Sequence, residues 1–361
     1  MQLTNILASS LVGLLGLATI STALPTESTH RYGESTKPRY GACKNPAIRK
    51  EWRTLSTHQQ DDYVRSVKCL MHSPGKLQAL ASGVKTRWED FIYIHQIKMP
   101  MVHNVGQFLP FHRLYLYEYE RVLRSECDYA GYLPYWDAKQ DGADIVSAPI
   151  FSPSHGFGGN GAYDPAAIIP FLNITADGGG CLFDGPFAGE VIHTGHEGDT
   201  TYHERCIKRN FLQLPATRWF NAAAEQDVLA SETYERFAVV LEGDGDLNNT
   251  LGIHNAGHLG VGGDMLDQWA SPSDPIFFVH HANIDRIWSV WQSKSSQNQW
   301  AIGNPIASRN PLTRPLWPDA PMGNVTLGFR IDMGPMGSRL DVRVEQVMDT
   351  RGSMIGGGER G

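Results

Sequence analysis

Several features that define other functional classes are missing from this chain of 361 residues. Its one strongly apolar run, Leu11 to Ile20, is shorter than the roughly 20 residues that a membrane-spanning helix needs. The formal net charge is −7 and Lys and Arg are not clustered, which argues against a nucleic-acid surface or a polybasic membrane patch. None of the five cysteines forms a C-x-x-C pair, so neither a zinc ribbon nor a thioredoxin-like site is indicated.

Residues 1–23 are predicted to be a signal peptide, with a buried N-terminal helix as the alternative. The short apolar run is followed by Ser21-Thr22-Ala23, a small-residue stretch that suits signal-peptidase cleavage. Five cysteines in an oxidising compartment would form two disulfides and leave one thiol. We therefore expect a protein that is secreted or kept in a secretory compartment, with no membrane association after cleavage. Glycosylation is expected at the N-x-S/T sequons Asn173, Asn248 and Asn324.

Residues 24–361 are predicted to form a single, mainly α-helical domain with long loops and a few short strands. Hydrophobic residues make up 41% of the chain, enough for a large core, and no linker, charge block or repeat divides it. Gly, Pro and Asp are frequent between Asp141 and Thr200, which indicates surface loops, and Val342-Arg343-Val344 alternates as a strand does. The predicted helices cover residues 86–97 (ended by Pro100), 110–125 (with Pro110 in the first turn), 232–242 and 274–292.

Six of the fourteen histidines fall into two local groups of three. His254 and His258 are four residues apart, so on a helix both would project from one face, as a shared metal ion requires. Pro110 argues against one continuous helix through His103 and His112, so we place His103 on a loop and His112 in the helix that follows. The first group is His95, His103 and His112, and the second is His254, His258 and His281.

The residue types in these groups restrict the metal. Imidazole ligands suit copper, zinc, iron or nickel, whereas magnesium and calcium prefer oxygen ligands. Two Cu(I) ions could together supply the two electrons that reduce O2 to peroxide, whereas zinc has no redox chemistry. Asp285 lies four residues after His281, where its carboxylate could accept a hydrogen bond from the imidazole N–H and fix the ring.

Another set of histidines offers an alternative metal group. His193, His196 and His203 lie in Gly-rich sequence without regular spacing or aromatic neighbours, so we expect them on a solvent-exposed loop. Phe108 and Phe111, beside the first group, could wall a substrate pocket or simply pack in the core.

Longer motifs around the histidines resemble those of the type 3 copper proteins, which are tyrosinases, catechol oxidases and haemocyanins. The similarity covers about residues 41–350, and its N-terminal part is similar to the short secreted fungal branch. The motifs that carry it are Asn45-Pro-Ala-Ile-Arg49-Lys-Glu51-Trp52-Arg53, Phe108-Leu-Pro-Phe-His112-Arg113, Gly131-Tyr-Leu-Pro-Tyr-Trp136-Asp137, Val261-Gly-Gly-Asp-Met265 and Asp274-Pro-Ile-Phe-Phe-Val-His280-His281-Ala-Asn-Ile-Asp285-Arg286-Ile-Trp288.

The resemblance implies a four-helix bundle that holds two copper ions at the base of a cleft. We take His281 rather than His280 as the ligand in the second group, because Asp285 then lies one turn further along. Members with strong monophenol activity pair an asparagine just after the first histidine of the second group with a glutamate, and the two hold a water. Asn255 matches that asparagine and Glu242 is the candidate glutamate. The implied copper ligands are His95, His103 and His112 for one ion and His254, His258 and His281 for the other.

Two departures from the family pattern change what is expected. Met101 precedes His103 by two and no cysteine is near, so no thioether cross-link to His103 is predicted. The C-terminus also lacks the Cys-Tyr-x-Tyr-like sequence of many relatives, and the missing cysteine could explain the odd cysteine count.

The sequence thus favours a dinuclear copper oxidoreductase that uses O2 to hydroxylate a phenol, to oxidise a catechol to an o-quinone, or both. Its partner would be a small phenolic or tyrosine-containing substrate, in pigment or secondary-metabolite biosynthesis. One alternative is a zinc-dependent lyase or hydrolase built on the same histidines. The other is an O2 carrier, which would need a domain that shields the copper from phenols; the chain has no spare length for one.

Overall fold

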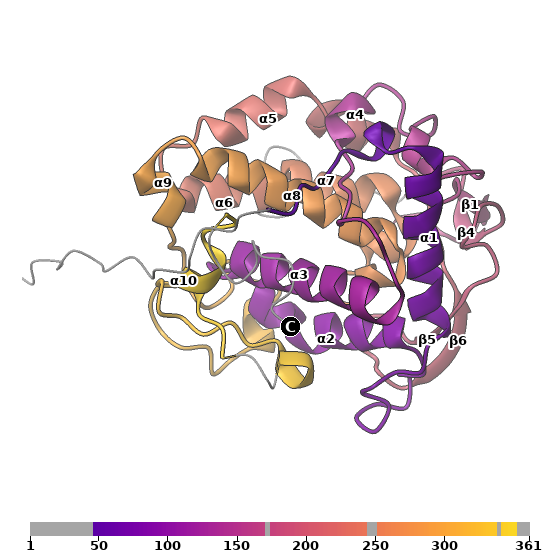
Figure 1. Ribbon diagram of the computed structural model, residues 1–361, viewed down its shortest axis with the longest axis horizontal. Helices are drawn as coiled ribbons and strands as arrows, with labels where there is room; N and C mark the ends of the chain where they lie inside the picture. The colour runs from indigo at the N-terminus through magenta and orange to yellow at the C-terminus, as the bar shows by residue number, and fades with distance from the viewer. Residues whose placement is uncertain (1–45, 170–173, 244–250, 338–340, 352–361) are drawn as a thin grey trace, which may run out of the picture. The chain divides into compact units, whose positions relative to one another are not determined.

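Helices are the predominant regular elements of the structure, as the sequence predicts (Figure 1). The α-helices are α1 (Thr57–His72), α2 (Arg87–Val102), α3 (Phe108–Glu126), α4 (Gln213–Trp219), α5 (Ala222–Leu229), α6 (Tyr234–Glu242), α7 (Gly252–Val261), α8 (Ile276–Gln292), α9 (Ser296–Trp300) and α10 (Val344–Val347). The 3-10 helices are η1 (Trp52–Thr54), η2 (Ala138–Gln140), η3 (Pro149–Phe151), η4 (Gly263–Leu266), η5 (Ser271–Ser273), η6 (Arg314–Leu316) and η7 (Gly334–Gly337).

The computed structural model describes four stretches of the chain, residues 46–169, 174–243, 251–337 and 341–351. The predicted signal peptide, Cys43 and the sequon residues Asn173 and Asn248 lie outside them. Asn324 is described, and its side chain is exposed. Among the helices of these stretches, none combines the length and apolar character of a membrane span.

Four helices form the bundle that carries the candidate ligands. α3 packs against both α2 and α8, and α8 packs against α7, so these helices lie together in Figure 1. The contact between α3 and α8 is aromatic: the rings of Tyr119 and Phe278 stack with their centroids 3.6 Å apart. Phe91 of α2 meets both of these rings edge-on. The predicted four-helix bundle is therefore the observed core.

Polar residues cap the N-termini of the first two long helices. Ser56 and Thr86 each form a capping box with the residue three positions later, Gln59 in α1 and Glu89 in α2. Each box satisfies backbone N–H groups that have no partner inside the first helical turn. The carboxylate of Glu89 also accepts hydrogen bonds from the backbone N–H and the ring of His193, which joins the start of α2 to a β-hairpin.

The predicted end of α2 at Ile97 is wrong, because the helix continues through Pro100 to Val102. Proline cannot donate a helical hydrogen bond and crowds the preceding turn. Here only two residues follow it, and Met99 and Val102 on either side are buried, so tertiary packing holds the last turn. α3 begins at Phe108, with Pro110 in its first turn as predicted.

The described strands lie between residues 161 and 206, mostly within the stretch 141–200 where loops were expected, and the described part of the tail after Asn304 contains none. They form three antiparallel pairs: β1 (Gly161–Tyr163) with β4 (Gly179–Leu182), β2 (Ile168–Ile169) with β3 (Ile174–Thr175), and β5 (Val191–Thr194) with β6 (Tyr202–Cys206). The predicted strand at Val342-Arg343-Val344 is wrong. Val342 and Val344 are buried as the alternation indicates, but the pairing is a single bridge from Arg343 to Arg330, too short for a strand.

Two disulfides are present, as the cysteine count predicts. Cys69–Cys127 ties α1 to the end of α3, and Cys181–Cys206 ties β4 to β6.

A buried ion pair fixes the start of α8. Arg209, just after β6, donates two hydrogen bonds to the carboxylate of Asp274 at 2.6 and 2.8 Å, and both side chains are fully buried. Asp274 in turn accepts a hydrogen bond from the backbone N–H of Ile276, the first residue of α8. The remaining guanidinium donors go to backbone carbonyls of Phe157, Gly158 and Gly159. Arg209 therefore links the strand region to the helix that carries His281.

Replacing Arg209 by Met should destabilise the fold by about 3–5 kcal/mol, because it leaves Asp274 buried without its cation. The matched control is Arg236→Met, which breaks an exposed pair with Asp227 and should cost less than about 1 kcal/mol. Urea unfolding of both variants measures the difference. Equal, small losses would show that the buried pair does not hold α8 in place.

Candidate metal centre

The first histidine group comes together at the junction of α2 and α3. His95 lies in the middle of α2, His103 caps its C-terminal end, and His112 lies one turn into α3. One nitrogen from each ring lies within 4.8 Å of the others, and all three side chains are buried. The loop predicted between His103 and His112 is what allows both rings to point to the same place. We call these three residues triad A.

The second group forms on α7 and α8. His254 and His258 project from one face of α7, as their spacing predicts, and His281 comes from α8. The Nε2 atom of His258 lies 3.1 Å from that of His254 and 3.3 Å from that of His281. A metal about 2.0–2.1 Å from each nitrogen would place its ligands about 3.3 Å apart. We call these three residues triad B.

Hydrogen bonds at the other ring nitrogen fix the tautomer of most of these rings. A carbonyl oxygen only accepts, so a ring nitrogen bonded to it must carry the proton. The Nδ1–H groups donate to carbonyls at 2.7–3.2 Å: His95 to Trp269, His103 to Met99, His112 to Phe108 and His258 to Met265. His254 Nδ1 similarly faces Asn255 Oδ1 at 2.9 Å.

Each of these rings therefore directs an unprotonated Nε2 inward. The Nε2 atoms of His95 and His112 are buried with no hydrogen-bond partner among the described residues. In triad B the Nε2 lone pairs of His254 and His258 face each other, and two such lone pairs repel each other. A bound cation would satisfy all of these lone pairs at once, so both triads fit a metal ion.

Burial keeps the rings neutral. It lowers the pKa of both His95 and His258 to about 4. Burial lowers the pKa of the other four rings well below its usual value: His103, His112, His254 and His281. Metal ligation requires neutral imidazole, so the rings are in the required protonation state at neutral pH.

The two triads face each other directly, and aromatic side chains pack against both of them. The rings of His112 and His281 stack with centroids 4.5 Å apart. Phe108 is fully buried and packs against His112 of triad A and His254 of triad B at 4.7 and 4.8 Å, while its role as a wall of the substrate pocket stays a prediction. Phe277 is a neighbour that the sequence analysis missed; its ring lies 4.1 Å from His281. Its position four residues before His281 on α8 is the signal that could have identified it.

His280 does not join either triad. Its Nε2–H donates to the backbone carbonyl of His254 at 3.0 Å, so the ring braces α7 against α8. The choice of His281 as the converging histidine matches this arrangement. Gly257 makes room for the His280 ring, since a Cβ atom at that position would overlap it.

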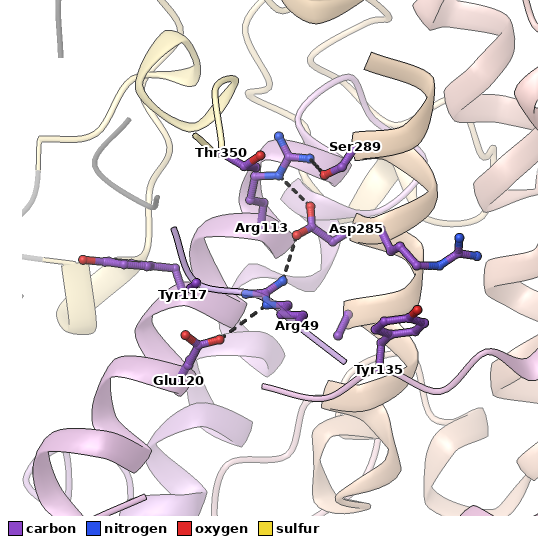
Figure 2. A pocket seen from close by; sticks show the side chains of 11 residues that line it. Arg49, Arg113, Tyr117, Glu120, Tyr135, Asp285, Ser289 and Thr350 are labelled. Atoms are coloured by element: carbon purple, nitrogen blue, oxygen red, sulfur yellow. Dashed lines mark hydrogen bonds and ion pairs between the residues drawn. The ribbon is translucent and has the colours of Figure 1, made fainter. Parts of the chain in front are cut away.

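The predicted contact between Asp285 and His281 is wrong. The Asp285 carboxylate instead accepts hydrogen bonds from Arg113 of α3 at 2.5 Å and from Arg49 at 2.9 Å, as Figure 2 shows. Arg113 is almost fully buried, so an unpaired guanidinium there would be costly, and it draws the carboxylate away from the histidine. His281 Nδ1 has no hydrogen-bond partner among the described residues.

Asp285 and the two arginines line a pocket of about 210 Å³ that contains none of the six triad histidines. Its other lining residues include Tyr117 and Tyr135, which Figure 2 shows on either side of Arg49. The pocket belongs to the outer surface of α3 and α8 and not to the metal centre.

Glu242 is buried beside the loop that follows His103. Its carboxylate accepts hydrogen bonds from the backbone N–H of Asn104 at 2.5 Å and from Arg309 at 3.1 Å. Burial raises the pKa of Glu242 to about 7, although both partners pull it down. Asn255 is only partly buried and holds His254, while the water that Asn255 and Glu242 are predicted to share stays a prediction.

The alternative histidine group does not converge. His193 pairs with Glu89, His196 with Asp267 and His203 with Asp199, each at 2.7–3.0 Å. His196 and His203 are exposed on the β5–β6 hairpin, as the loop interpretation predicts.

Comparisons with known proteins agree with this geometry. The family model for the common central domain of tyrosinase matches residues 85–294, which contain all six triad histidines. The chain is 32% identical over 338 residues to tyrosinase-like protein phomQ1' of Diaporthe leptostromiformis, a match that covers 90% of this chain and 82% of that protein. It is 30% identical over 338 residues to N-acetyl-6-hydroxytryptophan oxidase ivoB of Emericella nidulans, with 86% and 91% covered.

A solved structure is similar over most of the chain. A polyphenol oxidase variant from Thermothelomyces thermophila superimposes with a TM-score of 0.76 at 30% identity, over 86% of this chain and 88% of that one.

Gly257→Ala should destabilise the protein by about 1–3 kcal/mol, because the new methyl group displaces the His280 ring and breaks its bond to His254. Gly260→Ala on the same helix is the control, since the nearest atom to the added Cβ would be in the Ile145 side chain, 3.4 Å away. The same Cβ would also lie 3.7 Å from the Leu212 carbonyl oxygen and 3.9 Å from Phe220, which are ordinary van der Waals distances. Gly260→Ala should therefore be neutral or stabilise by up to about 1 kcal/mol. Urea unfolding measures the stability of both variants. If Gly257→Ala is as stable as Gly260→Ala, His280 does not brace α7 against α8.

Glu242 should make stability depend on pH. Its pKa is raised in the folded state, so its contribution to stability is full below about pH 4.5 and is lost as pH rises through about 7. Glu242→Gln removes this dependence. The stability of the native protein relative to Glu242→Gln should therefore fall by up to about 3 kcal/mol between pH 4.5 and 8. A difference that stays constant over that range would contradict the assignment.

Proposed function

Because this chain belongs to the tyrosinase family, we propose that it is a secreted dinuclear copper oxidoreductase that oxidises phenols with O2. The reaction is ortho-hydroxylation of a phenol, oxidation of a catechol to an o-quinone, or both. The observation that supports this best is the pair of triads, in which ring nitrogens from three histidines converge: the Nε2 atoms of His95 and His112 have no hydrogen-bond partner among the described residues, and those of His254, His258 and His281 face only one another.

The donor set supports copper as the resident metal. Six neutral imidazoles suit a borderline-soft transition metal, and three per ion leave a coordination position open. The ligands are His95, His103 and His112 in triad A and His254, His258 and His281 in triad B. When bound, two copper ions supply the pair of one-electron redox centres that two-electron chemistry with O2 requires.

The protein's own residues orient the histidine rings, pack around them and leave one side of the site partly exposed. Nδ1 hydrogen bonds hold five of the six rings with Nε2 directed inward. Phe108 and Phe277 pack against rings of both triads. His258 and Asn255 are only partly buried, whereas the other five triad histidines are buried, so a phenol would approach from the side of these two residues. Asn255 is then placed to hold a water near the phenol hydroxyl.

The substrate we propose is a small phenol or the side chain of a tyrosine, in pigment or secondary-metabolite biosynthesis. One relative carries N-acetyl-6-hydroxytryptophan in its name, which is a hydroxylated aromatic of this kind. Residues 1–23 as a signal peptide and residues 24–361 as one domain remain part of the proposal. The two disulfides and the exposed sequon at Asn324 are compatible with passage through the secretory pathway.

The purified protein should contain two copper ions per chain, show a near-ultraviolet absorption band when hydrogen peroxide is added, and take up oxygen with a catechol. His112→Ala and His258→Ala each remove one ligand from one triad and should abolish uptake. His155→Ala is the matched control, because this exposed histidine pairs only with Asp61 on the surface.

Other outcomes select other functions. Zinc at two ions per chain without the absorption band would indicate the zinc-dependent non-redox enzyme. Copper and the band without oxygen uptake would indicate an O2 carrier. Full activity of a copper-free His112→Ala/His258→Ala double variant would eliminate the proposal.

A further inference from the structure

The triad histidines are oriented in two different ways, and both ways occur in triad A. His103 and His112 donate their Nδ1 protons to carbonyls four residues earlier in the chain, Met99 and Phe108. His95 and His258 instead donate to Trp269 and Met265, at 2.8 and 2.7 Å. Met265 and Trp269 lie in the same stretch, residues 262–275, which we call the α7–α8 connection. One short stretch therefore touches one ligand of each triad.

This connection has little regular structure of its own to hold those carbonyls in place. It consists of the 3-10 helices η4 (Gly263–Leu266) and η5 (Ser271–Ser273) and the turn between them. Carbonyl direction depends on the backbone dihedrals, so the turn must be fixed by other contacts if it is to orient two rings.

Asp267 supplies those contacts from the centre of the turn. One carboxylate oxygen accepts hydrogen bonds from the backbone N–H groups of Trp269 and Ala270 at 2.9 and 3.1 Å. The other accepts from the His196 ring and from the backbone N–H of Glu197 at 3.0 and 2.9 Å. The first pair closes the turn on itself, and the second fastens it to the β5–β6 hairpin.

The hairpin is in turn fixed to the bundle next to His95. Gln96 of α2 donates to the backbone carbonyl of Gly195 at 3.0 Å. At the two ends of the α7–α8 connection, Arg205 binds Asp264 and Arg209 binds Asp274. Three basic side chains of one strand region, at positions 196, 205 and 209, thus pair with three aspartates of the connection, at positions 264, 267 and 274.

We propose that the α7–α8 connection orients His95 and His258 together, and that Asp267 is the positioning residue that holds it in the required conformation. The proposal rests on the proposed function, because it requires that His95 and His258 bind metal. Among the described residues, Asp267 makes no hydrogen bond to a triad histidine; it acts on the two rings through the stretch that carries the carbonyls of Met265 and Trp269, and on His95 also through its charge. Its loss should therefore weaken metal binding at both triads at once, although each triad keeps its three histidines.

The test compares Asp267→Ala with Asp199→Ala. The control also removes an aspartate that pairs with a histidine, but that pair, Asp199 with His203, stays within the hairpin. In Asp267→Ala, chelators should remove both copper ions about 10–100-fold faster than from the native protein, with a weaker and shifted band after peroxide addition. Asp199→Ala should match the native protein. Asp267→Asn keeps an oxygen for Trp269 and Ala270 and should restore most of the copper retention.

A second readout does not depend on copper. In metal-free protein labelled with 15N-histidine, the Nδ1–H signals of His95 and His258 should shift or broaden together in Asp267→Ala, while those of His103 and His112 stay. Copper release at the native rate, loss from one triad only, or unchanged Nδ1–H signals would each overturn the proposal. A native protein that binds no copper but shows these coupled signals would defeat the proposed function and leave the role of the connection intact.

Discussion

Six imidazole rings, five of them buried and one partly buried, direct ring nitrogens at one another in two groups of three, and the rest of the structure depends on this arrangement. A buried acceptor without a partner is costly, and here several such acceptors are concentrated in one place. Neutral rings alone have no reason to converge in this way. The fold must therefore stabilise an arrangement that only a bound cation makes favourable, and it does so with rigid helices and a closely packed aromatic layer.

The bundle meets this requirement by combining short-range and long-range support. Triad A takes two of its histidines from a sharp junction between α2 and α3, where backbone carbonyls four residues earlier orient the rings. Triad B depends on the packing of α7 against α8, with His280 bracing one helix on the other. The α7–α8 connection then reaches across to His95, so the two halves of the centre are tied by backbone hydrogen bonds as well as by ring stacking.

The parts of this architecture that depend on local chemistry could be predicted from the sequence. The spacing of His254 and His258 and the position of Pro110 in the first turn of a new helix each act within a turn or two of the chain, and both were predicted correctly. The end of α2 was misplaced because buried neighbours on other elements outweigh the local effect of Pro100. The strands were misplaced for a similar reason, since the pairs at residues 161–206 depend on distant partners and a disulfide that no periodicity indicates.

Asp285 shows why a spacing of four residues was not sufficient to assign a partner. On α8 it has a histidine one turn before it and two arginines beside it from other parts of the chain, and opposite charges in a buried setting attract more strongly than a neutral ring does. The same holds for Asp264 and Asp274, which pair with Arg205 and Arg209.

The acceptors that orient the triad rings are neutral. Asp264, Asp274 and Asp285 pair with arginines, and the Nδ1–H groups of the triad rings donate to carbonyl or amide oxygens and not to carboxylates. Glu242 is the buried acid that contacts the residue after His103, and its pKa of about 7 lets its charge change near neutral pH. The carboxylates near the centre thus make no hydrogen bonds to the described triad rings. For the aspartates, this separation depends on long-range ion pairs that sequence spacing does not reveal.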